Sequence, residues 1–191
     1  MLLPVAAVGH VAERVRRCRC GNVSAMSLGE PELSAEERGH LERCLELAEQ
    51  GLAAGDEPFG SVLVGADGGR LAESRNRVVA TGDQTQHPEI ELARWAAQHL
   101  SPAERARATV FTSGEHCPMC AAAHAWVGLG RIVYAHSSEQ LAQWLNEFGA
   151  APPPVRMLPI HVVAPDVQVQ GPVMDLALRM RELHRRFRQQ A

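Results

Sequence analysis

Two short motifs thirty residues apart constrain this sequence more than any other feature in it. The letters HPE occupy residues 87–89 and CPMC occupies residues 117–120, and each motif opens an apolar stretch. One imidazole, from His87, and two thiolates, from Cys117 and Cys120, are zinc ligands that leave a fourth tetrahedral position open for water. The fold must therefore bring the starts of two distant segments together around one metal ion.

The spacing within each motif indicates what the metal does. Cys117 and Cys120 stand at positions i and i+3 of a helix, so both sulfurs point to the same side, and the helix start favours their thiolate form. Zinc lowers the pKa of bound water from about 16 toward about 7 and so supplies a nucleophilic hydroxide. Glu89 follows His87 by two residues and is placed to reach that water as general acid and base. We predict a hydrolytic zinc site with its own proton carrier.

These motifs resemble the H-x-E and P-C-x-x-C pattern of the cytidine deaminase superfamily. The neighbouring residues are similar to its guanine deaminase branch, namely Asn76, the Thr-Ser pair at 112–113 and the alanines at 121–123. The sequence departs from the family pattern at His116, which replaces a proline before Cys117. Because the two residues adjoin, binding of both to one ion is strained, and we interpret His116 as a pocket wall or surface residue.

The resemblance implies hydrolytic deamination of a nucleobase or related heteroaromatic amine, with one zinc ion per chain and release of ammonia. Guanine is the first expectation for the substrate, with an aminotriazine as a similar ring. The resemblance also implies that Asn76 contacts the purine and that Glu147 lies in the region of a second catalytic acid. Asn76 suits a strand end or turn for local reasons as well, and Glu147 suits a solvated helix face. A homodimer or higher oligomer is implied too, with a C-terminal region able to close a neighbour's pocket.

Other functions stay open at this stage. Cytosine or nucleoside deamination and tRNA adenosine deamination belong to the same class; an arginine-rich last helix favours tRNA, but the net charge of −3 and the absence of lysine disfavour it. A C-x-x-C motif is also typical of a redox pair. A noncatalytic zinc-stabilised scaffold would need a fourth ligand, and Cys44 has the apolar neighbours of a helix core. Such a scaffold has no use for Glu89, which favours the catalytic interpretation. We expect a small-molecule substrate as the partner, and neither a nucleic acid nor a membrane.

The remainder of the chain has the alternating strand and helix patterns of an α/β protein. Ser34 and Glu37 form a capping box at the start of the first helix. Successive strand, helix and strand patterns around residues 117–120 predict a parallel crossover. We expect a three-layer α/β/α sandwich, with a mixed five-stranded sheet and helices on both faces. The expected strands are residues 58–64, 70–80, 108–112, 131–135 and 157–163, and the last helix spans residues 173–188.

Residues 1–32 differ in composition from the rest of the chain. Their charges follow a short apolar start rather than precede it, which argues against a secretory signal. We predict a disordered leader or a mis-assigned start, with Met26 as an alternative start, and a deaminase domain over residues 33–191. Cys18 and Cys20 fit such a leader better than a metal site. With 46% hydrophobic and 21% charged residues and no apolar stretch long enough for a membrane span, we expect a cytoplasmic protein.

Overall fold

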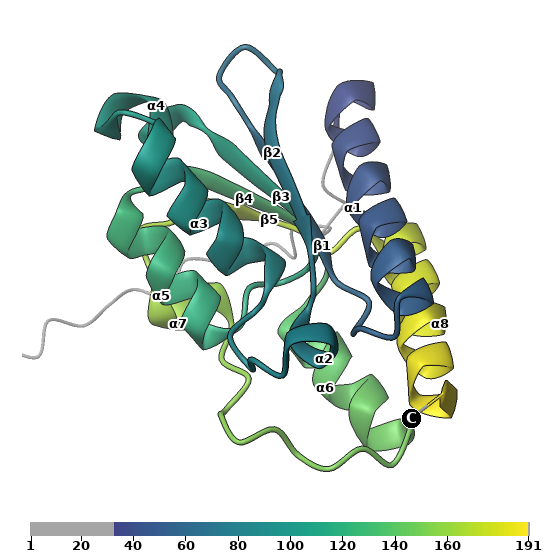
Figure 1. The fold of residues 1–191 in the computed structure, drawn as a ribbon. Helices are drawn as coiled ribbons and strands as arrows, with labels where there is room; N and C mark the ends of the chain where they lie inside the picture. The colour runs from purple at the N-terminus through teal and green to yellow at the C-terminus, as the bar shows by residue number, and fades with distance from the viewer. Residues whose placement is uncertain (1–32, 191) are drawn as a thin grey trace, which may run out of the picture.

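The computed structural model describes residues 33–190 (Figure 1). The interpretation of residues 1–32, including Cys18 and Cys20, lies outside the described residues. The sheet consists of β1 (Gly60–Val64), β2 (Arg70–Arg75), β3 (Thr109–Gly114), β4 (Arg131–His136) and β5 (Val169–Gln170). Its strand order is β2-β1-β3-β4-β5. β1 pairs antiparallel with β2 and β3, whereas β3, β4 and β5 run parallel, so the predicted mixed five-stranded sheet is confirmed.

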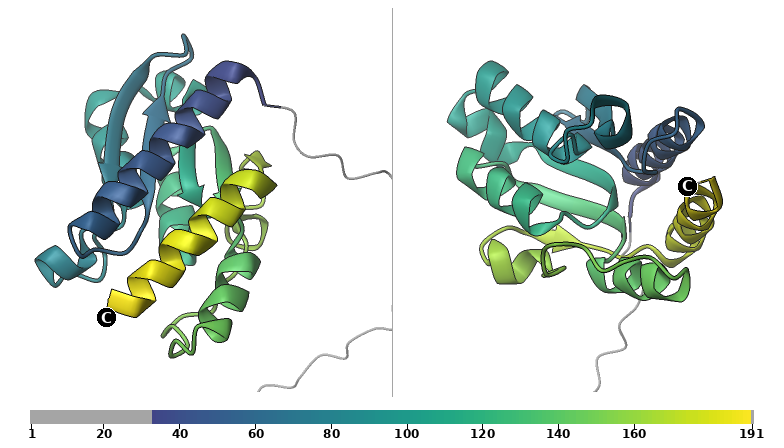
Figure 2. Two further views of the ribbon diagram at one scale, coloured as in Figure 1. Left: turned by 90° about the vertical axis from the view of Figure 1, so that its right-hand side faces the viewer. Right: turned by 60° about the horizontal axis from the view of Figure 1, so that its bottom comes forward.

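Helices cover both faces of this sheet, as the sequence predicts for a three-layer sandwich (Figure 2). The helices are α1 (Ala35–Ala53), α2 (Val78–Thr81), α3 (Pro88–His99), α4 (Pro102–Arg107), α5 (Pro118–Val127), α6 (Ser138–Glu147), α7 (Ile160–Val163) and α8 (Met174–Gln190). α1 and α8 lie side by side on one face, and α3 and α5 lie side by side on the other. None of these helices is both long and apolar enough to cross a membrane.

The core consists of apolar clusters on the two faces of the sheet, and β1 contributes to both. Val62 and Val64 pack in the cluster beneath α1 and α8, whereas Leu63 packs beneath α3. Successive side chains of a strand point to opposite faces, so a strand buried on both faces needs the continuous apolar run found here. Cys44 on α1 is fully buried in the first cluster, which confirms its predicted place in the core.

The helix ends follow local sequence signals. The Ser34 hydroxyl accepts a hydrogen bond from the backbone N–H of Glu37, and the Glu37 carboxylate accepts one from the backbone N–H of Ser34, which is the predicted capping box. Gly128 ends α5 with φ of 72°, a left-handed conformation that glycine adopts at little cost. The crossover from β3 through α5 to the parallel β4 is present as predicted.

Two predicted strands differ from the structure. Residues 70–80 do not form one strand, because β2 ends at Arg75 and α2 follows. The Asn76 side-chain oxygen accepts a hydrogen bond from the backbone N–H of Val78 at 2.9 Å, and this local turn competes with strand pairing. Residues 157–163 contain α7 rather than a strand.

The fifth strand is β5, only two residues long and placed after α7. The backbone N–H of Ile160, which a strand would use for pairing, instead donates to the Glu115 carboxylate at 2.9 Å. A two-residue strand leaves no periodic signal in a sequence. The last helix is confirmed, and its apolar stripe is buried through Leu176, Met180 and Leu183.

Candidate metal centre and active site

The three predicted ligands come together where α3 and α5 begin. His87 is the N-cap of α3 and Cys117 is the N-cap of α5, and both have extended backbones followed by proline. Proline disfavours helical geometry in the preceding residue and fits the first helical turn itself. The sequence therefore ends each connecting loop at a ligand, and the packing of α3 against α5 brings the two ligands to one place.

The ligand geometry fits a tetrahedral zinc ion. The side-chain atoms of His87, Cys117 and Cys120 lie within 4.8 Å of one another. Nδ1 of His87 is 3.7 Å from Sγ of Cys117 and 3.6 Å from Sγ of Cys120. A tetrahedral zinc with bonds of about 2.3 Å to sulfur and about 2.0 Å to nitrogen separates those atoms by roughly 3.6 Å. These residues therefore suit zinc in both donor type and spacing, with His87 binding through Nδ1.

The ligands also influence one another's charge. A hydrogen bond from Cys120 lowers the pKa of Cys117 to about 4, against the opposing effect of burial. A hydrogen bond with Cys117 in turn raises the pKa of His87 to about 9. The site thus stabilises the thiolate of Cys117, the form that binds zinc, whereas the hydrogen bond with Cys117 and burial raise the pKa of Cys120.

Glu89 lies beside the ligands at the centre of a buried hydrogen-bond chain. The residue is 6% exposed. The Ser61 hydroxyl donates to Thr112 Oγ1 at 2.9 Å, and Thr112 donates to Glu89 Oε1 at 3.1 Å. The Cys120 sulfur lies 3.5 Å from the other oxygen, Oε2. Burial raises the pKa of Glu89, so this carboxyl group holds a proton more firmly than an exposed one.

Ser61 is a site residue that the sequence analysis missed. It lies within β1 between buried neighbours and pairs across the sheet with Thr112. A hydroxyl in an otherwise apolar strand was the available signal, because a buried polar group requires a hydrogen-bond partner. Its partner lies on β3, fifty-one residues away, and only the fold reveals that link.

Asn76 is fully buried, and its segment is joined to the one that carries His87. Its backbone N–H donates to the Phe59 carbonyl at 2.9 Å, and the next residue, Arg77, donates its backbone N–H to the Gln86 carbonyl beside His87. The Asn76 side-chain oxygen accepts a hydrogen bond from the backbone N–H of Val78, so the side-chain amide nitrogen is not used in this turn. This nitrogen has no hydrogen-bond partner within residues 33–190. A buried unpaired donor is costly, and a ligand that accepts its hydrogen bond would remove that cost.

Glu147 has a different environment. It is exposed at the end of α6, where its carboxylate accepts hydrogen bonds from Arg181 at 2.8 Å and from Gln143 at 2.9 Å. The Arg181 hydrogen bond lowers its pKa. In the described part of the chain Glu147 forms no hydrogen bond or ion pair with the zinc ligands or with Glu89, so its catalytic role stays a prediction from the resemblance.

His116 is not a surface residue. It is 1% exposed, and its ring packs edge-on against His124 with centroids 5.4 Å apart. Burial lowers its pKa well below the usual value. The surface alternative is therefore wrong, and a neutral imidazole lies under the turn before Cys117 where the family pattern has proline.

Comparison with known proteins agrees with this site. A family model described as the cytidine and deoxycytidylate deaminase zinc-binding region matches residues 34–136. A probable cytosine deaminase from Schizosaccharomyces pombe is 30% identical over 122 residues, which cover 64% of this chain and 74% of that protein. A guanine deaminase from Bacillus subtilis is 36% identical over 104 residues, which cover 54% of this chain and 66% of that protein. The crystal structure of NE0047 in complex with 2,6-diaminopurine is 26% identical with a TM-score of 0.61, covering 82% of this chain and 83% of that chain.

Proposed function

Because this chain belongs to the cytidine and deoxycytidylate deaminase family and is a zinc-dependent deaminase, we propose that it removes the amino group of guanine. The observation that carries the choice of substrate is the buried amide nitrogen of Asn76, which has no partner in the described residues and belongs to the segment that Arg77 joins to Gln86, the residue before His87. A purine offers ring-nitrogen and carbonyl acceptors to such a donor. The similar guanine deaminase and the diaminopurine complex support a purine as well.

In this proposal Glu89 moves the protons of the reaction. Zinc, when bound by His87, Cys117 and Cys120, supplies a water of lowered pKa. Glu89 takes a proton from the attacking water and gives it to the ring nitrogen beside the amine-bearing carbon as the new C–O bond forms. It then takes the remaining proton of that hydroxyl group and passes it to the amine. The C–N bond breaks, the oxygen becomes a carbonyl, and ammonia leaves. Thr112 holds one carboxylate oxygen and leaves Oε2 to exchange protons, and the raised pKa suits a group that must both accept and donate near neutral pH.

A substrate panel with an ammonia readout tests the proposal. Guanine should have the highest kcat/KM among guanine, cytosine, adenine, their nucleosides and an aminotriazine. The Asn76→Asp variant keeps the oxygen that accepts from Val78 but loses the amide donor, so kcat/KM for guanine should fall on the order of 100-fold. Asn146→Asp on the exposed side of α6 is the matched control and should behave as wild type. A preference for cytosine or a nucleoside, with Asn76→Asp unaffected, would refute guanine as the substrate.

Cytosine is the second candidate substrate, because the similar Schizosaccharomyces pombe protein is a probable cytosine deaminase. The same panel separates the two rings. A tRNA substrate has less support from the last helix, since three of its arginines are already in ion pairs within the chain: Arg179 with Glu42, Arg181 with Glu147 and Arg185 with Glu182. Binding of RNA that weakens steeply with salt would favour tRNA instead.

We also propose the homodimer implied by the resemblance. Trp126 on α5 is 89% exposed, and a large apolar side chain on an outer helix is commonly covered by a partner. Sedimentation analysis of wild type and Trp126→Gln tests the association.

Two expectations stay predictions from the sequence. The first is that residues 33–191 form a single deaminase domain, and the second is that the protein is cytoplasmic.

A further inference from the structure

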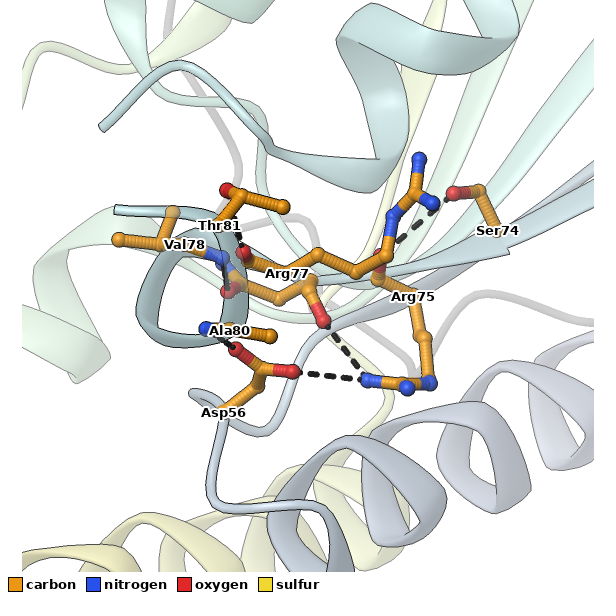
Figure 3. Close-up of polar contacts among 8 residues, drawn as sticks. Asp56, Ser74, Arg75, Arg77, Val78, Ala80 and Thr81 are labelled. Atoms are coloured by element: carbon orange, nitrogen blue, oxygen red, sulfur yellow. Dashed lines mark hydrogen bonds and ion pairs between the residues drawn. The ribbon is translucent and has the colours of Figure 1, made fainter. Parts of the chain in front are cut away.

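Asp56, in the loop between α1 and β1, forms an ion pair with Arg75, the last residue of β2. The Arg75 guanidinium donates a hydrogen bond to Asp56 Oδ2 at 2.9 Å. The Asp56 side chain is fully buried, whereas that of Arg75 is 30% exposed. Figure 3 shows the carboxylate between Arg75 and the backbone of Ala80. A carboxylate removed from water needs hydrogen-bond partners for both of its oxygens, and Asp56 has them.

The second oxygen of Asp56 supports the start of α2. The first N–H groups of a helix have no partner within the helix and need acceptors from elsewhere. The N-cap residue of α2, Arg77, makes no side-chain capping hydrogen bond. Asp56 Oδ1 instead accepts from the Ala80 backbone N–H at 2.8 Å (Figure 3). Asn76 Oδ1 accepts from the Val78 backbone N–H at 2.9 Å. A helix of four residues is too short to be stable alone, so these two side chains fix its position.

Arg75 also acts on Asn76 directly. The nitrogen that donates to Asp56, Nη1, donates to the Asn76 backbone carbonyl at 3.1 Å as well. On its other side, the Asn76 backbone N–H donates to the Phe59 carbonyl at 2.9 Å. The backbone N–H, the backbone carbonyl and the side-chain oxygen of Asn76 thus all have partners. The direction of the buried amide nitrogen, which has none in the described residues, is set by these three contacts.

The same segment is joined to the metal centre. The residue after Asn76, Arg77, donates its backbone N–H to the Gln86 carbonyl at 3.1 Å, and the next residue is His87, the N-cap of α3. The contacts therefore run from the ion pair through Asn76 to the segment that presents a zinc ligand. A change at the ion pair would displace the Asn76 amide relative to that ligand.

We propose that the Asp56–Arg75 ion pair is a positioning device, which directs the Asn76 amide nitrogen at the substrate and so sets the affinity for guanine. This inference rests on the proposed function, in which that nitrogen donates to the purine. The pair acts through the backbone of Asn76 and through α2, and it touches neither the substrate nor the metal. Because displacement of a binding group by about 1 Å lowers activity substantially, the pair matters although it lies outside the pocket.

The first test uses Arg75→Met, which keeps the length of the side chain but removes its donors to Asp56 and Asn76. KM for guanine should rise roughly 10-fold while kcat and zinc content stay at wild-type values, because Glu89 and the ligands are unchanged. Arg75→Lys keeps a positive charge beside Asp56 but not the rigid guanidinium, so it should fold normally and show a smaller rise in KM. Arg70→Met, at the exposed start of the same strand, is the matched control and should keep the wild-type KM.

A double-mutant cycle with Asn76→Asp separates positioning from a general structural role. If the pair acts through the Asn76 amide, Arg75→Met should change kcat/KM of the Asn76→Asp protein by less than about 2-fold, because the donor to be positioned is already absent. The same roughly 10-fold loss in both backgrounds would show that the two residues act independently, and the proposal would be wrong. A wild-type KM in both Arg75 variants, or a loss of zinc or of kcat with KM unchanged, would also overturn it.

The Asn76 amide itself gives a readout that does not depend on turnover. In the NMR spectrum of isotope-labelled, zinc-loaded protein, its NH₂ signals are identified by their absence from the Asn76→Asp spectrum. They should move in both Arg75 variants and stay in place in Arg70→Met. Unmoved signals refute the positioning role even if guanine is the substrate. If wild type does not deaminate guanine, the proposed function and the guanine affinity fail together, and moved signals would still show that the pair orients the amide.

Discussion

At the scale of single residues, the chemistry depends on how Glu89 is held. A carboxylate near a metal centre has two oxygens, and the Ser61–Thr112 chain occupies one of them through a hydrogen bond of 3.1 Å from Thr112. The second oxygen faces the sulfur of Cys120. Because the group is buried, its carboxylate is poorly solvated and its pKa is raised. This environment favours a group that gains and loses a proton in each turnover.

Replacement of Glu89 by glutamine should therefore separate proton transfer from metal binding. Glu89→Gln should keep about one zinc per chain and the wild-type melting temperature, but lower kcat by roughly 10²- to 10⁴-fold, the usual contribution of general acid–base catalysis. Metal analysis and steady-state kinetics measure the two effects. Glu91→Gln on the same helix should leave both unchanged, whereas Cys117→Ala should lose zinc and activity together. Near-normal turnover in Glu89→Gln would exclude the proton-transfer role.

The ligands and Glu89 could be predicted from sequence because local geometry relates them. The i, i+3 spacing of Cys117 and Cys120 and the prolines after each N-cap act within a single helix turn. Ser61 could not be predicted in this way. Its importance depends on the pairing of β1 with β3, which no spacing along the chain records.

At the scale of the elements, the contact between α1 and β1 sets the position of the loop that joins them. Gly60 begins β1, and a Cβ atom there would lie 2.5 Å from the Cβ of Leu47 and would also collide with the Cys44 carbonyl oxygen. The helix and the strand therefore approach as closely as they do only because residue 60 has no side chain.

Gly60→Ala should lower the free energy of unfolding by about 1–3 kcal/mol, the usual cost of overpacking. Gly39→Ala is the matched control: it lies within α1 with no atom within 4 Å of the added Cβ. This control should raise the free energy of unfolding by about 0.5–1 kcal/mol, since alanine is the better helix former. Urea denaturation of both variants measures the difference. Equal free energies of unfolding for the two variants would contradict the close approach of α1 to β1 at Gly60.

The predicted helices with long apolar stripes are confirmed. The predicted strands were wrong where hydrogen bonds in the folded chain outweighed the local apolar pattern. α1 and α8 carry apolar stripes over many turns, and both are confirmed. The apolar run at 157–163 resembled a strand, but Glu115 takes the backbone N–H of Ile160 and a helical turn forms. Asn76 likewise ended β2 earlier than its β-branched neighbours suggested, through its own hydrogen bond to Val78.

At the scale of the whole molecule, α8 closes the face opposite the zinc ligands and places two buried histidines together. His136 at the end of β4 is 1% exposed and His184 on α8 is 4% exposed, with ring centroids 5.3 Å apart. Phe59 and Trp144 pack against them. Nε2 of each histidine lacks a hydrogen-bond partner in the described residues. The two histidine side chains thus pack the last helix against the sheet while both rings are uncharged.

This pair should make stability depend on pH. Burial lowers the pKa of His136 to about 4; burial, with His136 and Arg188 nearby, lowers the pKa of His184 well below its usual value. Above about pH 6.5, the ordinary histidine value, both rings are neutral in the folded and unfolded states and contribute nothing. As the pH falls from about 6.5 toward 4, the unfolded state binds protons that the folded state does not. Each histidine should then cost about 1.4 kcal/mol of stability per pH unit.

The variant His184→Phe isolates that contribution, because phenylalanine keeps an aromatic ring against Phe59 and Trp144 but cannot take up a proton. Its free energy of unfolding, measured by urea denaturation from about pH 7 to about pH 4.5, should fall less steeply than that of wild type by about 1.4 kcal/mol per pH unit below 6.5. Carboxylates, the other histidines and the zinc ligands titrate in both proteins, so the difference in slope removes their effects. The exposed His161→Gln variant is the matched control and should retain the wild-type slope, because the substitution leaves the buried histidine pair unchanged. Parallel curves for wild type and His184→Phe would mean that His184 is charged or solvated in the folded protein, and that α8 does not seal this face.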